Sequence, residues 1–383
     1  MDNELRIIIS GGGTGGHIFP AVSIANAIKE KCPEAKILFV GAEGRMEMQR
    51  VPAAGYEIEG LPVSGFNRKN LLKNISILIK LWKSQRKAKQ IIQKFKPQVA
   101  VGVGGYASGP TLNMAGKLGI PTLLQEQNGY AGVTNKLLAK RANKICVAYE
   151  QMERFFPADK IIMTGNPVRQ TLVQTNLTRK EGLEFFNLDP KKKTILIIGG
   201  SLGARTINES ILAGLESVCT NNEDSKIGEQ VQLIWQTGKY YYKEMNERVK
   251  QISTKELPLY MNDFISSMEH AYAAADLIIS RAGAGSISEF CLLGKAVILV
   301  PSPNVAEDHQ TKNAMALVKK GAAICITDKE APIKLIPEAL SLIHDTAQIL
   351  KLEENILTLA KPNAAATIAN EVIQLANEYR SAH

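Results

Sequence analysis

Two stretches of the chain decide the fold: IIISGGGTGGH at residues 7–17 and ILIIGGSLGAR at residues 195–205. Each begins as a run of isoleucine and leucine, which is typical of a strand buried in a parallel sheet. A glycine-rich loop and the start of a helix follow. Glycine lets backbone N–H groups approach a ligand closely, and a helix N-terminus favours negative charge. Two such units half a chain apart predict two similar α/β domains that face each other across a cleft.

The rest of the sequence repeats the same alternation of apolar runs and helical patterns, which is typical of βαβ units in parallel sheets. The turn-rich segment TGNPVR, residues 164–169, indicates a domain boundary. We therefore expect domains at 1–165 and 166–362, and a last helix in 363–383 that packs back on the first domain. Strands are expected at 7–9, 36–40, 98–103, 120–124, 144–148, 194–198, 231–235, 276–279, 296–300 and 322–326.

The composition, with 45% hydrophobic and 22% charged residues, is that of a globular protein. Five scattered cysteines without a CxxC pair argue against a disulfide framework or a zinc site. The acidic N-terminus predicts no signal peptide, and no apolar run is long enough to span a bilayer. Residues 1–165 contain 23 Lys and Arg against 12 Asp and Glu, whereas residues 166–383 contain 23 against 25. The basic half is expected to meet an anionic partner, which could be a membrane, a nucleic acid or a phosphate-bearing substrate.

The glycines at 11, 13 and 16 match the dinucleotide fingerprint, which is a weak signal by itself. An NAD site would also want an acidic residue at the end of the second strand, where only Glu43 is available. The extra Gly12, the adjacent His17 and the second phosphate-type loop all disfavour an NAD-dependent enzyme. That enzyme class remains a minor alternative.

His17 lies at the start of a helix, where the helix dipole disfavours the imidazolium and lowers the pKa of the ring. A neutral imidazole at a cleft can act as a general base. A histidine that only packs or caps the helix is the alternative.

Four further loops follow strands and are candidate ligand sites, because α/β proteins bind ligands at the carboxyl ends of their strands. In SRAGAGSISE, residues 280–289, Glu289 could accept two hydrogen bonds from a ribose diol or could cap the helix. The loop PSPNVAEDHQ, residues 301–310, has no third ligand beside Asp308 and His309 that would indicate a metal. The loops GVGGYASGP, 102–110, and QEQNGYAG, 125–132, carry amides suited to sugar hydroxyls or to helix capping.

Together these motifs resemble the bacterial peptidoglycan N-acetylglucosaminyltransferases of the MurG family. The matching set runs in order along nearly the whole chain: GGGTGGH, GGYASGP, EQNGYAG, GNPVR, GGSLGAR, SISE and AEDHQTKNA. The resemblance implies the GT-B architecture, in which two Rossmann-like doubly wound domains flank an interdomain cleft. It also implies transfer of GlcNAc from UDP-GlcNAc to the 4-hydroxyl of the MurNAc of lipid I. The family inverts the anomeric centre and uses no metal or cofactor.

By position, the resemblance implies that His17 is the general base and that Glu289 binds the ribose. Arg169 and the backbone at Ile265 would face the uracil. The full set of donor residues implied is Thr14, Gly15, Gly16, Asn128, Arg169, Ser201, Ile265, Ala284, Gly285, Ser286, Ile287, Ser288, Glu289 and Gln310. The acceptor side would include Gly104, Gly105, Tyr106, Ser108 and Glu126. One departure from the family is Gln125, which stands where many members carry histidine.

The implied partners are UDP-GlcNAc, lipid I, an anionic membrane surface and other cell-wall synthesis proteins, but no nucleic acid. The implied location is peripheral, on the cytoplasmic face of the bacterial inner membrane. A GT-B epimerase or glycolipid synthase acting on UDP-GlcNAc, and a nucleotide-sugar or RNA binding module, are the alternatives.

Residues 69–89 are expected to form a helix with two unlike sides. Leu71, Ile75, Leu78 and Trp82 share one stripe, and Lys69, Lys73, Lys80, Lys83 and Lys87 lie on the opposite side. The lysines predict electrostatic docking on an anionic membrane. For the apolar stripe, packing against the domain's own sheet is the alternative.

Overall fold

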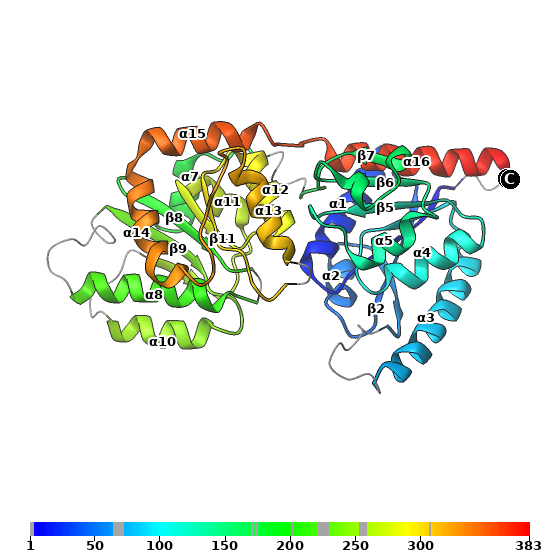
Figure 1. Ribbon diagram of the computed structural model, residues 1–383, viewed down its shortest axis with the longest axis horizontal. Coiled ribbons are helices and arrows are strands. Elements are labelled where there is room, and N and C mark those ends of the chain that lie inside the picture. The colour runs from blue at the N-terminus through cyan, green and yellow to red at the C-terminus, as the bar shows by residue number, and fades with distance from the viewer. Residues whose placement is uncertain are drawn as a thin grey trace. The chain divides into compact units, whose positions relative to one another are not determined.

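A computed structural model describes residues 4–63, 73–169, 172, 175–200, 202–220, 230–252, 259–305 and 308–383, except for the side chains of 73–78 and 218–220. The chain divides into two compact units (Figure 1). The first consists of residues 1–170 and 361–383, and the second of residues 171–360.

The first unit contains a seven-stranded sheet in the order β3-β2-β1-β4-β5-β6-β7, and every pair in it is parallel. Strand β1 is central, and its Ile7 pairs with Ile37 on one side and Val99 on the other. The strands are β1 Arg6–Ser10, β2 Lys36–Ala42, β3 Glu57–Leu61, β4 Val99–Gly102, β5 Thr122–Glu126, β6 Lys144–Val147 and β7 Ile161–Met163. The helices are α1 Gly15–Lys31, α2 Glu47–Ala53, α3 Lys73–Phe95, α4 Ser108–Lys117, α5 Val133–Ala139 and α16 Ala364–Ala382, with short 3₁₀ turns η1 Met152–Arg154 and η2 Ala158–Lys160.

Alternate side chains of β1 point to opposite faces of this sheet, as strand geometry requires. Ile7 and Ile9 are fully buried with the apolar sides of α1 and α16, whereas Ile8 packs with residues of α3, α4 and α5. Both faces are therefore covered, which explains why β1 is apolar at successive positions instead of at every second one. The C-terminal helix α16 packs against α1 within this unit (Figure 1).

The second unit contains a six-stranded parallel sheet in the order β10-β9-β8-β11-β12-β13. Ile195 and Ile197 of β8 pack with α8 and α14, and Leu196 and Ile198 pack on the other face with α11 and α12. The strands are β8 Lys193–Ile198, β9 Val231–Gln236, β10 Leu259–Asn262, β11 Leu277–Ser280, β12 Val297–Leu299 and β13 Ile324–Cys325. The helices are α7 Arg179–Phe185, α8 Arg205–Thr220, α10 Tyr242–Ile252, α11 Met268–Ala274, α12 Ala284–Leu293, α13 His309–Val318, α14 Ala331–His344 and α15 Thr346–Leu357. The predicted fold class, with two doubly wound parallel-sheet domains, is confirmed.

The predicted helix at 69–89 corresponds to α3, although residues 69–72 and the side chains of 73–78 lie outside the described part of the chain. The helix buries Ser84, Ala88, Ile91 and Ile92. Trp82 is 62% exposed, so packing of the apolar stripe on the domain's own sheet is wrong at this position. None of the helices in the described residues combines the length and the hydrophobicity that a bilayer-spanning segment needs.

Candidate active site

The loops that follow β1, β4 and β5 meet at the carboxyl edge of the first sheet. This is where the strand order reverses, between β1 and β4, and such switch points bind ligands in doubly wound sheets. A Cβ atom on Gly104 would lie 2.9 Å from the His17 ring, and one on Gly105 would lie 2.4 Å from the backbone oxygen of Gly12. Glycine at these positions therefore lets the loops after β1 and β4 approach each other.

The glycine-rich loop after β1 is held in place by Glu47, a residue that no sequence motif had indicated. Glu47 is 1% exposed, and its carboxylate accepts hydrogen bonds from the backbone N–H groups of Gly13, at 2.8 Å, and Ala42, at 3.0 Å. Side-chain atoms of Glu47 fill the space in which Gly12 would carry a Cβ. Because the Gly13 N–H is engaged in this way, the loop's contribution to anion binding would come from residues 14–16, among which Thr14 and Gly16 are exposed.

His17 lies in the first turn of α1, and its Nδ1 is 3.1 Å from the Gln127 side-chain oxygen. The amide nitrogen of Gln127 donates to the Val103 carbonyl at 2.8 Å, so the amide oxygen faces the histidine. In a neutral imidazole, Nδ1 would then be the donor and Nε2 the nitrogen without a proton. This tautomer suits a general base that uses Nε2.

Behind Gln127, three amide side chains form a buried network. Gln125 donates to Asn166 at 3.0 Å, Asn166 donates to the backbone oxygen of Gln127 at 3.0 Å, and Gln127 contacts the Gln125 side-chain oxygen. All three residues are at most 3% exposed. Gln125 stands at the position where many family members carry histidine. It contacts Gln127, and it is Gln127 that contacts His17.

Several residues predicted for the acceptor side are engaged within the fold. Ser108 is buried, and its hydroxyl lies 2.7 Å from the Ser10 carbonyl and 2.9 Å from the Gly104 carbonyl. Glu126 is 2% exposed and accepts from the N–H of Gly132 and from Asn135, both at 2.9 Å. These two residues shape the loops, whereas Tyr106 is 53% exposed.

Two predicted donor residues of the first unit are partly accessible. The Arg169 guanidinium lies over the Phe19 ring, 5.5 Å from its centroid. Asn128 is half-buried, and its backbone N–H donates to Glu126 at 3.2 Å. Glu43, the acidic residue considered for an NAD site, instead pairs with Lys87 at 2.9 Å.

In the second unit, Gln236 connects two of the predicted donor loops. Gln236 ends β9 and is 3% exposed. Its amide donates to the Gly200 carbonyl at 3.1 Å and accepts from the Ile265 N–H at 2.9 Å. The Ile265 N–H is therefore taken, so its carbonyl is the backbone group that could face a base. Ser201, on the same loop as Gly200, lies outside the described residues.

The first six residues of α12, 284–289, are all predicted donor residues. The helix has no acidic residue in its first turn and no side-chain cap. Ala284 and Ile287 are buried, so only their backbone could meet a ligand, and a Cβ on Gly285 would have open space. The Ser288 hydroxyl donates a hydrogen bond to the Ala284 carbonyl at 2.9 Å. Uncapped N–H groups at a helix start are suited to phosphate.

The loops at the same edge of this sheet are joined by side chains that the sequence did not single out. Arg281, 14% exposed at its side chain, contacts Asp328 and donates to the carbonyls of Val300 and Pro301 at 3.0 and 3.2 Å. The predicted donor residue Gln310 accepts from the Ser302 N–H at 2.9 Å through its side-chain oxygen. Its amide nitrogen is therefore the end that could serve a sugar.

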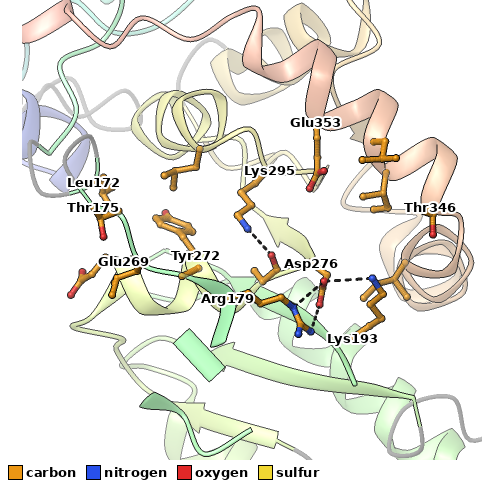
Figure 2. Close-up of a pocket in the computed structure, with 17 residues that line it drawn as sticks. Leu172, Thr175, Arg179, Lys193, Glu269, Tyr272, Asp276, Lys295, Thr346 and Glu353 are labelled. Carbon is orange, nitrogen blue, oxygen red and sulfur yellow. Dashed lines mark hydrogen bonds and ion pairs between the residues drawn. The ribbon is translucent and has the colours of Figure 1, made fainter. Parts of the chain in front are cut away.

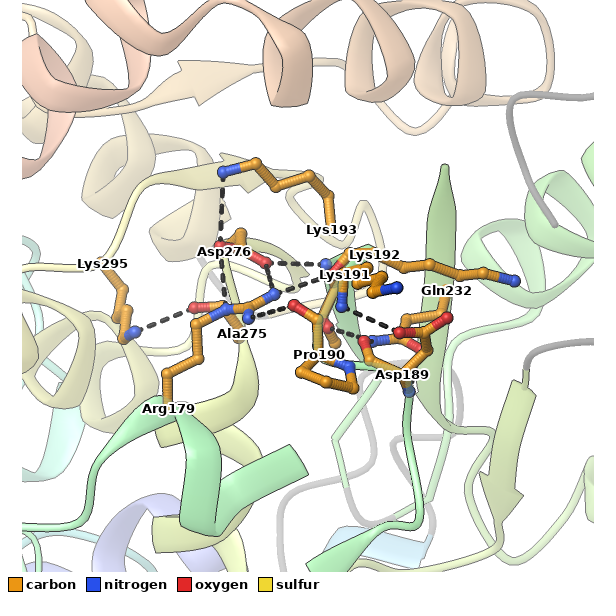
Figure 3. Close-up of polar contacts among 11 residues, drawn as sticks. Arg179, Asp189, Pro190, Lys191, Lys192, Lys193, Gln232, Ala275, Asp276 and Lys295 are labelled. Carbon is orange, nitrogen blue, oxygen red and sulfur yellow. Dashed lines mark hydrogen bonds and ion pairs between the residues drawn. The ribbon is translucent and has the colours of Figure 1, made fainter. Parts of the chain in front are cut away.

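A cavity of about 460 Å³ in the second unit involves none of the predicted site residues (Figure 2). It opens at the amino ends of β8 and β11, opposite to the loops described above. Asp276 at its wall accepts from the Thr194 N–H at 2.8 Å and from Arg179 at 2.9 Å, and it pairs with Lys193 at 3.6 Å (Figure 3). These contacts connect the segment before β11 to β8 and α7, so the charged groups at this cavity stabilise the fold.

Burial also shifts the pKa values of two ionisable groups at this cavity. The pKa of Lys295 is lowered, mainly because its ammonium is removed from water, and its Nζ donates to the Ala275 carbonyl at 2.8 Å. The pKa of Glu353 is raised, again mainly by burial. Among the residues that the structure describes, no group of three His, Cys, Asp or Glu side chains could hold a metal ion.

Comparison with known proteins gives matches along both units. The glycosyltransferase family 28 N-terminal domain matches residues 7–147, and the family 28 C-terminal domain matches residues 194–376. A protein of Bacteroides thetaiotaomicron, named UDP-N-acetylglucosamine–N-acetylmuramyl-(pentapeptide) pyrophosphoryl-undecaprenol N-acetylglucosamine transferase, is 66% identical over 98% of this chain and 99% of its own length. A protein of the same name from Porphyromonas gingivalis is 54% identical over the full length of both.

Solved structures agree with this assignment. The crystal structure of Acinetobacter baumannii MurG matches with a TM-score of 0.75 and 26% identity, over 97% of this chain and 99% of that one. A UDP-GlcNAc 2-epimerase from Neisseria meningitidis matches with a TM-score of 0.64 at 14% identity, which shows a common fold alone. The chain belongs to glycosyltransferase family 28 and, within it, to the MurG family that its sequence motifs predicted.

Proposed function

We propose that this protein transfers GlcNAc from UDP-GlcNAc to the 4-hydroxyl of the MurNAc of undecaprenyl-pyrophosphoryl-MurNAc-pentapeptide, lipid I, and so forms lipid II for peptidoglycan synthesis. The observation that carries the proposal is the identity of 54–66% over nearly full length to relatives with that printed activity. The predicted motifs lie on the loops at the carboxyl edges of both sheets, which further supports it.

The direct test is release of UDP from UDP-GlcNAc with and without a lipid I analogue. A transferase releases UDP at a rate that depends on the acceptor, and the disaccharide product forms in equal amount. Conversion of UDP-GlcNAc to its 2-epimer without acceptor would instead identify an epimerase and contradict the proposal.

We infer a single-displacement mechanism that inverts the anomeric carbon. The acceptor oxygen attacks C1 of GlcNAc, its proton passes to Nε2 of His17, and UDP leaves with the bonding electron pair. The backbone N–H groups at the start of α12 would offset the charge that develops on the diphosphate. Glu289 would accept from the ribose hydroxyls, and Arg169 with the Ile265 backbone would bind the uracil.

We further propose that no metal ion takes part, because helix N-terminal N–H groups can stabilise a diphosphate leaving group by themselves. Turnover in excess EDTA is expected to equal turnover in buffer. Loss of activity in EDTA that Mg²⁺ or Mn²⁺ restores would contradict this part of the proposal and leave the transferase activity standing.

We assign the acceptor and membrane side to the first unit and the donor side to the second. The protein would act peripherally, on the cytoplasmic face of the inner membrane, beside other cell-wall synthesis proteins. Two observations support this assignment. Residues 1–165 have a net charge of +11, from 23 Lys and Arg against 12 Asp and Glu, and the proposed acceptor is a lipid.

A further inference from the structure

Tyr272 makes a hydrogen bond that the proposed mechanism has not used. It lies on α11, is 3% exposed, and donates from its hydroxyl to Oε2 of Glu289 on α12 at 2.6 Å. Its ring packs edge-on against Phe290, with centroids 6.0 Å apart and an interplanar angle of 82°. Both the ring and the hydroxyl are therefore held against the helix that carries Glu289.

This contact restricts the orientation of the Glu289 carboxylate. A glutamate side chain loses considerable rotamer freedom when it is ordered, and a ligand that must order it binds more weakly. The tyrosine has already ordered the group, because its buried hydroxyl needs an acceptor and a carboxylate is a strong one. An ionised carboxylate has about four lone-pair positions, and the bond from Tyr272 uses one of them.

We propose that Tyr272 is a positioning residue that holds Glu289 in the orientation in which it accepts both ribose hydroxyls of a uridine nucleotide. A carboxylate in one fixed orientation favours the ligand that presents both hydroxyls together, whereas a mobile one can adjust to a single hydroxyl. Tyr272 thereby sets the preference for ribonucleotide over 2′-deoxyribonucleotide donors. This inference rests on the proposed ribose contact of Glu289.

The structure allows a conservative substitution at this position. Tyr272→Phe removes the hydroxyl and keeps the ring, which lines the cavity in Figure 2 on one side and contacts Phe290 on the other. Tyr56→Phe is a matched control in the first unit, because its hydroxyl makes a bond of similar length, 2.7 Å, to Asn26.

The experiment measures the affinity of the full-length protein for UDP and for 2′-deoxy-UDP by titration calorimetry, without an acceptor. Tyr272→Phe is expected to weaken UDP binding by about 3–10-fold, the range for a lost hydrogen bond, and to weaken 2′-deoxy-UDP binding by less. The ratio of the two affinities should fall, and Tyr56→Phe should leave it unchanged. In turnover, the KM for UDP-GlcNAc should rise while kcat stays within about twofold, because the contact is made before the transition state.

Glu289→Ala separates this inference from the proposed function. If Glu289→Ala leaves UDP affinity unchanged, the ribose contact itself is wrong, and the role of Tyr272 is overturned with it. If Glu289→Ala weakens UDP binding but Tyr272→Phe does not alter the ratio, only the role of Tyr272 is overturned. Tyr272→Phe should have no further effect in the Glu289→Ala background, and an equal loss there would assign its effect to the fold instead.

Discussion

At the scale of single residues, the neutral amide of Gln127 orients His17. Gln127 accepts from Nδ1 at 3.1 Å and fixes the tautomer without adding a charge next to the ring. A carboxylate in the same place would favour the imidazolium and raise the pKa of the histidine. An amide partner therefore suits a base that must be neutral before it accepts the proton of a sugar hydroxyl.

The proposed base can be tested by His17→Ala. We expect kcat to fall by about 10²–10⁴-fold, the usual contribution of general base catalysis, with little change in the KM for UDP-GlcNAc. Steady-state kinetics with a lipid I analogue gives both constants, and a thermal melt shows whether the variant is folded. A folded variant with near-normal kcat would show that His17 is structural.

The residues that the sequence failed to predict share one physical feature. Each makes a hydrogen bond to a residue distant in the sequence: Glu47 to Gly13, Gln236 to Ile265 and Tyr272 to Glu289. The partners are 34, 29 and 17 positions apart along the chain. Their partners come close only when the βαβ units have packed, so no local pattern distinguishes Glu47 from a surface glutamate such as Glu43. The glycine-rich loops were predictable because their requirement is local: a sharp backbone turn between a buried strand and a helix.

At the scale of elements, α7 and α11 cross where Gly182 has no side chain. A Cβ at this position would lie 2.6 Å from the Ala274 nitrogen and 2.6 Å from the His270 oxygen. Both are backbone atoms, which cannot move without shifting α11 and the Tyr272 that it carries.

We therefore expect Gly182→Ala to lower the free energy of unfolding of the second unit by about 1–3 kcal/mol, the usual cost of overpacking. Gly116→Ala on α4 is the matched control, because no atom lies within 4 Å of its added Cβ. That variant should be neutral or more stable by up to about 1 kcal/mol, since alanine is the better helix former. Urea unfolding measures both, and equal midpoints for the two variants would contradict the close helix crossing.

The start of α14 gives a prediction for pH dependence. The Lys334 ammonium and then the Thr327 hydroxyl hold the pKa of Glu330 at about 2, through bonds of 2.6 Å each. An unfolded glutamate titrates at about 4.3, so the unfolded chain binds this proton first as the pH falls. The contribution is therefore present above about pH 4.3 and is lost as the pH falls toward 2.

Glu330→Gln removes this titration. The urea midpoint of unfolding is measured at pH 5 and at pH 3. The decrease from pH 5 to pH 3 should be smaller in the variant than in the parent protein. Glu338→Gln, on the same helix, is a control whose midpoints should follow the parent. An identical acid dependence for Glu330→Gln and the parent would show that these bonds do not persist in solution.

Central strands could be predicted from the sequence, whereas three of the four edge strands could not; the fourth, β13, falls within the expected run 322–326. The expected runs at 7–9, 36–40 and 194–198 correspond to β1, β2 and β8, which are buried on both faces and therefore continuously apolar. The missed strands β3, β7 and β10 all lie at sheet edges, where burial is incomplete and polar residues are common. The sequence EIEGL of β3, for example, alternates charged with apolar side chains.

At the scale of the whole molecule, residues 1–165 carry a net positive charge, and exposed apolar side chains lie among the basic residues of α3. Trp82 and Ile79 are 62% and 52% exposed, and Lys80 and Lys83 beside them are exposed as well. The Arg86 guanidinium lies 5.8 Å from the centre of the Trp82 ring. Lys87 is committed to Glu43, so it does not count toward the charge available to a membrane.

Such a surface predicts peripheral and reversible binding to anionic bilayers. Each basic residue near the surface contributes about 1 kcal/mol, and salt screens this attraction within about 8 Å at physiological ionic strength. Tryptophan is the aromatic side chain that favours the headgroup region, so the exposed Trp82 should add binding that salt does not remove. We therefore expect flotation with anionic liposomes to fall at high salt but not to vanish.

Charge reversal on α3 tests whether this helix carries the binding. Lys80→Glu with Lys83→Glu should abolish most flotation with anionic liposomes and leave the weak binding to neutral ones unchanged, because only the electrostatic attraction is removed. Lys243→Glu with Lys250→Glu, two exposed lysines on α10 of the second unit, makes the same change in net charge elsewhere. Trp82→Ala should remove the part of the binding that persists at high salt. If the two charge reversals weaken flotation equally, net charge alone governs the binding, and docking through α3 is wrong.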